Sequence, residues 1–293
     1  MIKLLDSRFT LEVSKFSDGT RKVVVVSPAQ DMEAALSSIG LLGIEWLFED
    51  DSEVLTLIFV VNWLRDRVPG IHLYLDMPYV PYARMDRVEK VGDVFTLKYF
   101  AGIINSLQFD YVQVKDPHSR VTPALIDRVK VCDGYTKELI TGFLEDCLKK
   151  SENLSVVFPD RGSYERYTSL LGSVFERHKI QAIYGEKTRD WTTSQISSFS
   201  LNIRGKKPLL GNVVIIDDII TSGGTIKKCV EALDKMEVGE IKIYSTFLEE
   251  TALTSEPFRW VVDSGCRVFS NVFLFDVEKV GKELMKGISK ISI

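Results

Sequence analysis

The chain has 293 residues, of which 45% are hydrophobic and 27% are charged. This composition, at a length of about two domains of roughly 150 residues each, excludes a disordered, collagen-like or coiled-coil chain. Because 37 Lys and Arg stand against 41 Asp and Glu, for a net charge of −4, the chain lacks the basic field that drives phosphate-backbone binding, and we expect no nucleic-acid partner.

Localisation signals are also missing from the sequence. The longest apolar stretch, Val54–Leu64, is shorter than the roughly 20 residues of a membrane-spanning helix, and the start MIKLLDSRF lacks the apolar core of a signal peptide. The cysteines are widely spaced without a CxxC pair, so we expect buried thiols and neither disulfides nor zinc. They are Cys132, Cys147, Cys229 and Cys266. These features predict a soluble cytoplasmic protein with no membrane partner.

In the first half of the chain, short β-branched runs alternate with amphipathic stretches, which is typical of βαβ units and a mostly parallel sheet. We expect strands over residues 22–27, 71–75 and 111–115, and a helix over 52–67. A second helix is predicted by apolar residues at i, i+3, i+4 and i+7, all expected to pack against the sheet. These residues are Phe100, Ile103, Ile104 and Leu107.

The pattern resets after Asp133-Gly134, so we expect a domain boundary near residue 134, with domains over 1–134 and 135–293. A helix follows, with one apolar side formed by Leu139, Ile140, Phe143, Leu144 and Leu148. Strands are then predicted over 155–158, 181–184, 213–216 and 240–245, with a helix from about Thr225. The last segment, VEKVGKELMKGI (277–288), has a helical period and could pack on either domain. The fold class predicted is α/β, with two domains of similar build.

The sharpest local signal is NVVIIDDIITSGGTIKKCVEAL, residues 212–233. Gly223 and Gly224 allow a tight turn and a close approach to a ligand, and the following helix offers unpaired N–H groups at its positive end. Hydroxyl donors come from Thr221, Ser222 and Thr225. This pattern predicts a site for a phosphate monoester or a similar anion.

Asp217 and Asp218 precede that loop directly, where negative charge would repel a phosphate unless the carboxylates had another role. They could accept hydrogen bonds from the hydroxyls of an attached sugar, or bind a divalent cation. The alternative is a strand that ends in two solvated aspartates before an ordinary capped helix.

This segment resembles the phosphoribosyl-binding signature of the phosphoribosyltransferase superfamily, in which the paired acids meet the ribose hydroxyls and the loop wraps the 5-phosphate. Ribose-phosphate diphosphokinases, the PRPP synthetases, carry two such domains in tandem. The chain length and the boundary near residue 134 favour this branch. The resemblance implies two tandem phosphoribosyltransferase-like domains, each a mostly parallel sheet flanked by helices.

Two N-terminal segments are similar to ATP motifs of the PRPP synthetases. PYVPYARMDR (78–87) resembles PY-x-x-YARQDR, with Arg84, Asp86 and Arg87 matching and Met85 in place of glutamine. FSDGT (16–20) resembles F-S-D-G-E, which in family oligomers contributes to the adenine pocket of a neighbouring subunit. Phe16 and Asp18 match, and Thr20 replaces the glutamate. The resemblance therefore implies ATP as a substrate and a homo-oligomer, a dimer or larger.

Three further elements resemble metal and catalytic motifs of the family. KDPH (115–118) and FPD (158–160) are similar to D-L-H and S-P-D, which implies that His118 and Asp160 bind the catalytic Mg²⁺. Lys187 and Arg189 keep the spacing of a K-x-R that stabilises the transferring phosphates from a mobile loop. The Thr-, Ser- and Lys-rich stretch from 187 to 208 is expected to form that lid.

The implied reaction transfers the diphosphoryl group of ATP to the anomeric 1-hydroxyl of ribose 5-phosphate, giving PRPP and AMP. Thr221 stands where the family loop opens with Asp, and some phage-encoded relatives accept ADP-ribose to rebuild NAD, so ADP-ribose is an alternative acceptor. A PRPP-using phosphoribosyltransferase and a non-catalytic regulatory homologue are further alternatives.

Overall fold

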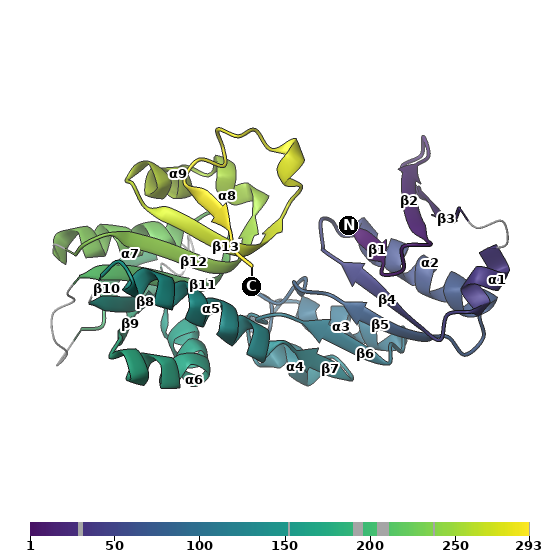
Figure 1. Ribbon diagram of the computed structural model, residues 1–293, viewed down its shortest axis with the longest axis horizontal. Coiled ribbons are helices and arrows are strands. Elements are labelled where there is room, and N and C mark those ends of the chain that lie inside the picture. Colours follow the sequence, from purple (N-terminus) through teal and green to yellow (C-terminus); the bar gives the residue numbers. More distant parts are fainter. Residues whose placement is uncertain (29–31, 152, 190–195, 204–210, 237, 293) are drawn as a thin grey trace. The chain divides into compact units, whose positions relative to one another are not determined.

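The computed structural model describes residues 1–28, 32–151, 153–189, 196–203, 211–236 and 238–292, with the backbone alone at 188, 189, 196 and 197. The chain divides into two compact units, Met1–Cys132 and Asp133–Ile293, and each is described by itself (Figure 1).

The N-terminal unit is built on a five-stranded sheet in the order β1-β4-β5-β6-β7. The strands β4 to β7 are parallel, and β1 pairs antiparallel with β4. Strand bounds are β1 (Ile2–Leu4), β4 (Leu41–Trp46), β5 (His72–Asp76), β6 (Tyr111–Val114) and β7 (Val129–Val131). A separate antiparallel hairpin consists of β2 (Thr10–Lys15) and β3 (Arg21–Val26). The helices are α1 (Met32–Ser37), α2 (Ser52–Arg67), α3 (Thr96–Ser106) and α4 (Val121–Leu125).

Helix α2 has the bounds that its sequence pattern predicts, but the buried face of α3 differs from the prediction. Phe100 and Ile104 are buried, as expected, whereas Ile103 is 38% exposed. Leu97 and Ala101 complete the buried face. Because successive residues turn by about 100°, these four share one arc and Ile103 falls at its edge.

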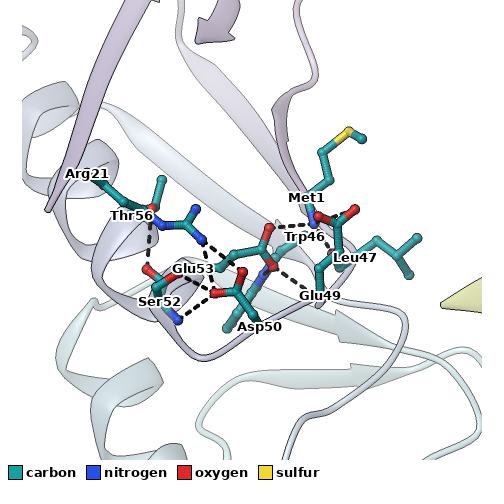
Figure 2. A network of polar contacts seen from close by, with 9 residues as sticks. All are labelled: Met1, Arg21, Trp46, Leu47, Glu49, Asp50, Ser52, Glu53 and Thr56. Carbon is teal, nitrogen blue, oxygen red and sulfur yellow. Dashed lines mark hydrogen bonds and ion pairs between the residues drawn. The ribbon is translucent and has the colours of Figure 1, made fainter. Parts of the chain in front are cut away.

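The N-terminus of α2 is anchored by a buried carboxylate. Glu53 is only 4% exposed; it pairs with the Met1 ammonium at 2.6 Å and accepts the Trp46 indole N–H at 2.9 Å. It also accepts the Glu49 backbone N–H at 2.9 Å, as Figure 2 shows. A buried carboxylate is tolerated where its oxygens are paired in this way, so the segment before α2 is tied to β4.

The C-terminal unit is built on a seven-stranded sheet in the order β10-β9-β8-β11-β12-β13-β14. Only β10, which pairs with β9, runs antiparallel to its described neighbour. Strand bounds are β8 (Leu154–Phe158), β9 (Gln181–Arg189), β10 (Ile196–Leu201), β11 (Asn212–Ile220), β12 (Ile241–Glu249), β13 (Arg267–Leu274) and β14 (Ile288–Lys290). The helices are α5 (Asp133–Leu148), α6 (Arg161–His178), α7 (Gly224–Leu233), α8 (Glu250–Thr254) and α9 (Glu256–Asp263).

Helices cover both faces of this sheet (Figure 1). Along β11, Val214 and Ile216 belong to the core under α5 and α6, whereas Val213 and Ile215 belong to the core under α7 and α9. A strand buried on both faces needs the continuous apolar run that the sequence has here. The predicted α/β class is confirmed.

One prediction on local structure is wrong. Residues 277–288 form no α-helix: a short 3₁₀ turn covers Val277–Lys279, and Leu284 and Met285 pack on the core of the C-terminal unit. The stretch from residue 187 that is expected to form a lid begins in β9 and contains β10, and its role as a lid stays a prediction. In β10 the exposed Ser198 and Ser200 alternate with the inward Phe199 and Leu201, a period of two that the serine content obscured. Residues 190–195 and 204–210 of that stretch lie outside the described residues.

Over the part of the chain that the structure describes, no helix combines the length and apolar character needed to cross a bilayer. All four cysteines are among the described residues and are thiols, as predicted. Three of them are buried, while Cys132 is half-buried.

Candidate active site

Four of the predicted site residues come together in the C-terminal unit. Asp160 follows β8, Lys187 lies in β9, and Asp217 and Asp218 lie in β11. Strand β8 pairs in parallel with both β9 and β11, so these side chains meet at the carboxyl ends of three neighbouring strands. Parallel sheets bind ligands at the carboxyl ends of their strands.

The two carboxylate oxygens of Asp160 have different partners, the N-terminus of α6 and the Lys187 ammonium. Its Oδ1 accepts the Ser163 backbone N–H at 3.0 Å, which caps the N-terminus of α6, and Lys187 Nζ donates to Oδ2 at 2.7 Å. Burial raises the pKa of Asp160, but the Lys187 ammonium and the Ser163 hydrogen bonds outweigh burial and hold the pKa below its usual range. Asp160 is therefore anionic and oriented.

The paired acids of β11 differ in their surroundings. Asp217 accepts the Ser163 hydroxyl and the Asp218 backbone N–H, each at 3.0 Å, and Asp218 pairs with Arg166 at 3.2 Å. Burial, and then the neighbouring charges of Asp218 and Asp160, raise the pKa of Asp217 well above its ordinary value. Asp218 is only 4% exposed, so the alternative of two solvated aspartates is wrong. The site concentrates negative charge.

Ser163 and Arg166 were missed by sequence reasoning. Both lie in α6, at three and six residues after Asp160, which places them near one face of the helix. The local signal was Asp160 itself, an ordinary N-cap residue, which marks the start of α6 and does not indicate which of its side chains face β11. Helix α6 thus supplies partners to all three acids.

The predicted phosphate loop connects β11 to α7. Gly223 has φ 71° and is the N-cap of α7, and a Cβ added to it would lie 2.8 Å from the Cβ of Phe258. Both the backbone conformation and the contact therefore require glycine. Gly224 has open space around it, with only the Ser222 Oγ within 4 Å. The Ser255 hydroxyl donates to the Ser222 carbonyl at 2.8 Å and fixes the turn.

The flanking hydroxyl residues of this loop are accessible. Thr221 and Thr225 are half-buried, and Ser222 is exposed. Since α7 has ten residues, its first-turn N–H groups can serve an anion that approaches Gly224.

In the N-terminal unit, the FSDGT segment is the turn of the β2–β3 hairpin. Phe16 is 56% exposed, and its backbone N–H donates to the Thr20 carbonyl at 2.8 Å. Asp18 accepts the Thr20 hydroxyl at 2.6 Å and the Thr20 N–H at 2.9 Å. The hydroxyl bond is the main cause of a lowered pKa at Asp18. Thr20, the residue that departs from the family motif, therefore closes the turn.

The PYVPYARMDR segment follows β5 as a series of turns. Arg84, Met85 and Arg87 are exposed, whereas Asp86 is 6% exposed. Arg87 Nε donates to Asp86 at 2.9 Å. The two arginines are thus accessible to an anion, and Asp86 orients one of them.

The remaining predicted residues are placed less fully. His118 is exposed and belongs to the N-terminal unit, so its pairing with Asp160 stays a prediction. Arg189 ends β9, and its side chain lies outside the described residues. Among the described side chains, no group of three or more His, Cys, Asp or Glu could enclose a metal ion.

The C-terminal unit carries a recognisable domain. Residues 135–278 match the phosphoribosyl transferase domain family. Ribose-phosphate pyrophosphokinase of Sulfurisphaera tokodaii is 26% identical over 239 residues, which cover 78% of this chain and 75% of that protein. The chain is a relative of the ribose-phosphate pyrophosphokinases. It is accordingly an enzyme of the transferase class.

A second ribose-phosphate pyrophosphokinase and a solved structure are also similar to this chain over most of its length. The protein from Clostridium acetobutylicum is 24% identical over 245 residues, covering 84% of this chain and 70% of its own length. The fold is that of phosphoribosylpyrophosphate synthetase from Mycobacterium smegmatis, with a TM-score of 0.73 at 16% identity over 97% of this chain and 86% of the other.

Proposed function

We propose that this chain transfers the diphosphoryl group of ATP to the anomeric 1-hydroxyl of a ribose 5-phosphate unit, in a magnesium-dependent reaction that releases AMP. The observation that carries the proposal is the cluster of Asp160, Lys187, Asp217 and Asp218 at one sheet edge, next to a glycine loop that opens a helix. The similarity to ribose-phosphate pyrophosphokinases supports the same chemistry.

The residues present fit a magnesium ion. Three carboxylates share the cluster, and burial, followed by the charges of Asp218 and Asp160, raises the pKa of Asp217. A divalent cation bound there would relieve the repulsion between these carboxylates. Mg²⁺ commonly binds through one or two carboxylates, waters and substrate phosphates, so a larger set of protein ligands is not required. Asp160, together with His118 as the family resemblance implies, would hold it. When bound, the ion would neutralise phosphate oxygens.

The C-terminal unit would position the acceptor. Asp217 and Asp218 accept hydrogen bonds from ribose hydroxyls, and the loop from Thr221 to Thr225 binds the 5-phosphate through its N–H groups and hydroxyls. Lys187, whose Nζ already lies at the sheet edge, then neutralises the charge that develops as the hydroxyl oxygen bonds to the β-phosphorus and AMP leaves. Arg189 is proposed to do the same.

The N-terminal unit would bind ATP. Arg84 and Arg87 are exposed and their guanidinium groups suit phosphate oxygens, while Met85 and Asp86 shape the same segment. The exposed ring of Phe16, on a turn that Asp18 and Thr20 close, supports a role at the adenine of a neighbouring subunit. We therefore propose a homo-oligomer, a dimer or larger.

The acceptor is ribose 5-phosphate or ADP-ribose. Thr221, in place of the acid with which the family loop opens, changes both charge and shape where the 5-substituent of the sugar would lie. We therefore keep ADP-ribose, with a role in rebuilding NAD, as the alternative acceptor. We place the reaction in the cytoplasm, since the four cysteines are thiols.

The deciding experiment incubates the protein with Mg-ATP and either ribose 5-phosphate or ADP-ribose, and measures AMP and the diphosphorylated product. The acceptor with the higher kcat/KM is the substrate. Absence of AMP with both acceptors would contradict the proposal. Consumption of PRPP with a free base would instead identify a phosphoribosyltransferase, and inactivity in both assays would favour a regulatory homologue.

A further inference from the structure

Two adjacent acids precede α2: Asp50 contacts Arg21, the residue directly after the 16–20 segment, and Asp51 contacts Tyr82 of the 78–87 segment. We infer that Asp50 and Asp51 are positioning residues, which set the β2–β3 hairpin and the 78–87 segment relative to each other within the N-terminal unit. The inference rests on the proposed function, because it concerns the affinity for ATP.

Asp50 contacts the hairpin. Arg21, the residue after Thr20, places its Nη2 3.0 Å from both carboxylate oxygens of Asp50, and the Arg21 side chain is only 14% exposed. Asp50 also accepts the Ser52 backbone N–H at 2.8 Å, so the carboxylate is fixed by the first turn of α2 (Figure 2). The turn end of the hairpin, where Arg21 pairs with Lys15, is thereby attached to the start of α2.

Asp51 contacts the other segment. The Tyr82 hydroxyl donates to the Asp51 carboxylate. Tyr82 has φ 62°, a left-handed conformation that a bulky residue adopts only where its surroundings enforce it. Its ring lies 5.1 Å from the ring of Phe100 and 6.3 Å from that of Phe48, measured between centroids. Tyr82 stands two residues before Arg84, so its anchor sets where that guanidinium projects.

Hydrogen bonds hold the chain on both sides of the two acids. Buried Glu53, which follows them, accepts from the Trp46 indole and from the backbone N–H of Glu49, which precedes them. The Asp50 side chain is 55% exposed, so its ion pair contributes less than a buried one. The Tyr82 to Asp51 bond is likewise exposed, but it acts directly on the 78–87 segment, so the test is made on this bond.

The test compares ATP binding with acceptor binding. Tyr82→Phe keeps the ring and removes the hydroxyl, Asp51→Ala removes the acceptor, and Asp51→Asn keeps an oxygen that can accept. We expect Tyr82→Phe and Asp51→Ala to weaken binding of a non-hydrolysable ATP analogue about tenfold, the usual worth of one charged hydrogen bond. The KM for the acceptor should stay within about twofold, and Asp51→Asn should recover part of the loss. In the double variant Tyr82→Phe/Asp51→Ala, the loss of affinity for the ATP analogue should be no larger than in either single variant, because both changes remove the same bond.

Asp66→Asn is the matched control, since Asp66 is an exposed acid on the same helix, and it should bind the analogue like the wild type. Equal losses for ATP analogue and acceptor would show a general structural role and overturn the inference. The inference would also be overturned if the variants bound the ATP analogue as tightly as the wild type. If the wild type formed product in that case, the proposed function would still stand. A wild-type protein that binds no ATP analogue would overturn both.

Discussion

Lys187 Nζ lies 2.7 Å from Asp160 Oδ2, so the residue proposed to neutralise the transferring phosphates is paired with the residue proposed to bind the metal. Their side chains are 23% and 35% exposed, which leaves the pair accessible to a ligand. Substrate binding must therefore separate two charges that stabilise each other in the protein alone.

Replacing Lys187 by Met should lower kcat by about 10² to 10³, the usual cost of losing one transition-state donor, while circular dichroism shows the fold retained. Lys149→Met is the control, because Lys149 forms an ion pair of the same length with Asp146 at the exposed surface. Wild-type turnover in the Lys187 variant would remove this lysine from the mechanism.

The ion pair between Arg166 and Asp218 should contribute to folding. The two side chains are 20% and 6% exposed, so Arg166→Met leaves a buried carboxylate without its cation, at a cost of about 3 kcal/mol. Combining it with Asp218→Asn should recover most of that loss in urea unfolding. Arg161→Met, which breaks an exposed pair with Glu165 on the same helix, should cost under about 0.5 kcal/mol. An equal loss in both single variants would contradict this account.

The two glycines of the phosphate loop should respond differently to alanine. Gly223→Ala combines a positive φ with a 2.8 Å contact to the Phe258 Cβ, and we expect it to lower the free energy of unfolding by about 1 to 3 kcal/mol. Gly224→Ala meets no atom closer than 3.8 Å and should leave stability nearly unchanged. Its methyl group should instead raise the KM for the acceptor phosphate. Thermal melts and steady-state kinetics of both variants separate the two effects.

Tyr82 predicts a pH dependence at the alkaline end. Burial and the bond to Asp51 raise its pKa to about 12, from the ordinary value of about 10 in the unfolded chain. Between these values the folded state keeps a proton that the unfolded state has lost, so stability falls as pH rises through this window, by at most about 1.4 kcal/mol per pH unit. The Tyr82→Phe variant has no phenolic hydroxyl at this position, so its stability does not depend on this titration. The difference in unfolding free energy between wild type and variant should therefore shrink from pH 10 to 12, and a constant difference would show that Tyr82 titrates normally.

Elements with a strong apolar period were predictable from the sequence, and short polar ones were not. Helix α2 and the start of β11 have continuous or periodic apolar residues, so burial alone dictates them. Strand β10 escaped notice because Ser198 and Ser200 occupy its exposed face. The 277–288 segment shows the opposite error: Gly281 and Gly287 disfavour a helix more than its apolar spacing favours one.

The residues of the candidate site also divide into those that the sequence predicted and those that it did not. Asp217, Asp218 and the glycine loop were found because their order along the chain repeats a known signature. Ser163 and Arg166 were missed because their roles depend on how α6 lies against β11, which no local pattern contains. Likewise, nothing in the sequence shows that Asp160 is both the cap of α6 and the partner of Lys187.

Lys187 occupies its place because of the register between β8 and β9. Val157 stands opposite Ile183 and Phe158 opposite Tyr184, which brings Lys187, farther along β9, to Asp160 just after β8. Since side chains alternate along a strand, a slip of one residue would bring Glu186 or Thr188 to the position of Lys187. The first of these reverses the sign of the charge that meets Asp160, so an insertion or deletion that moved this register would exchange attraction for repulsion.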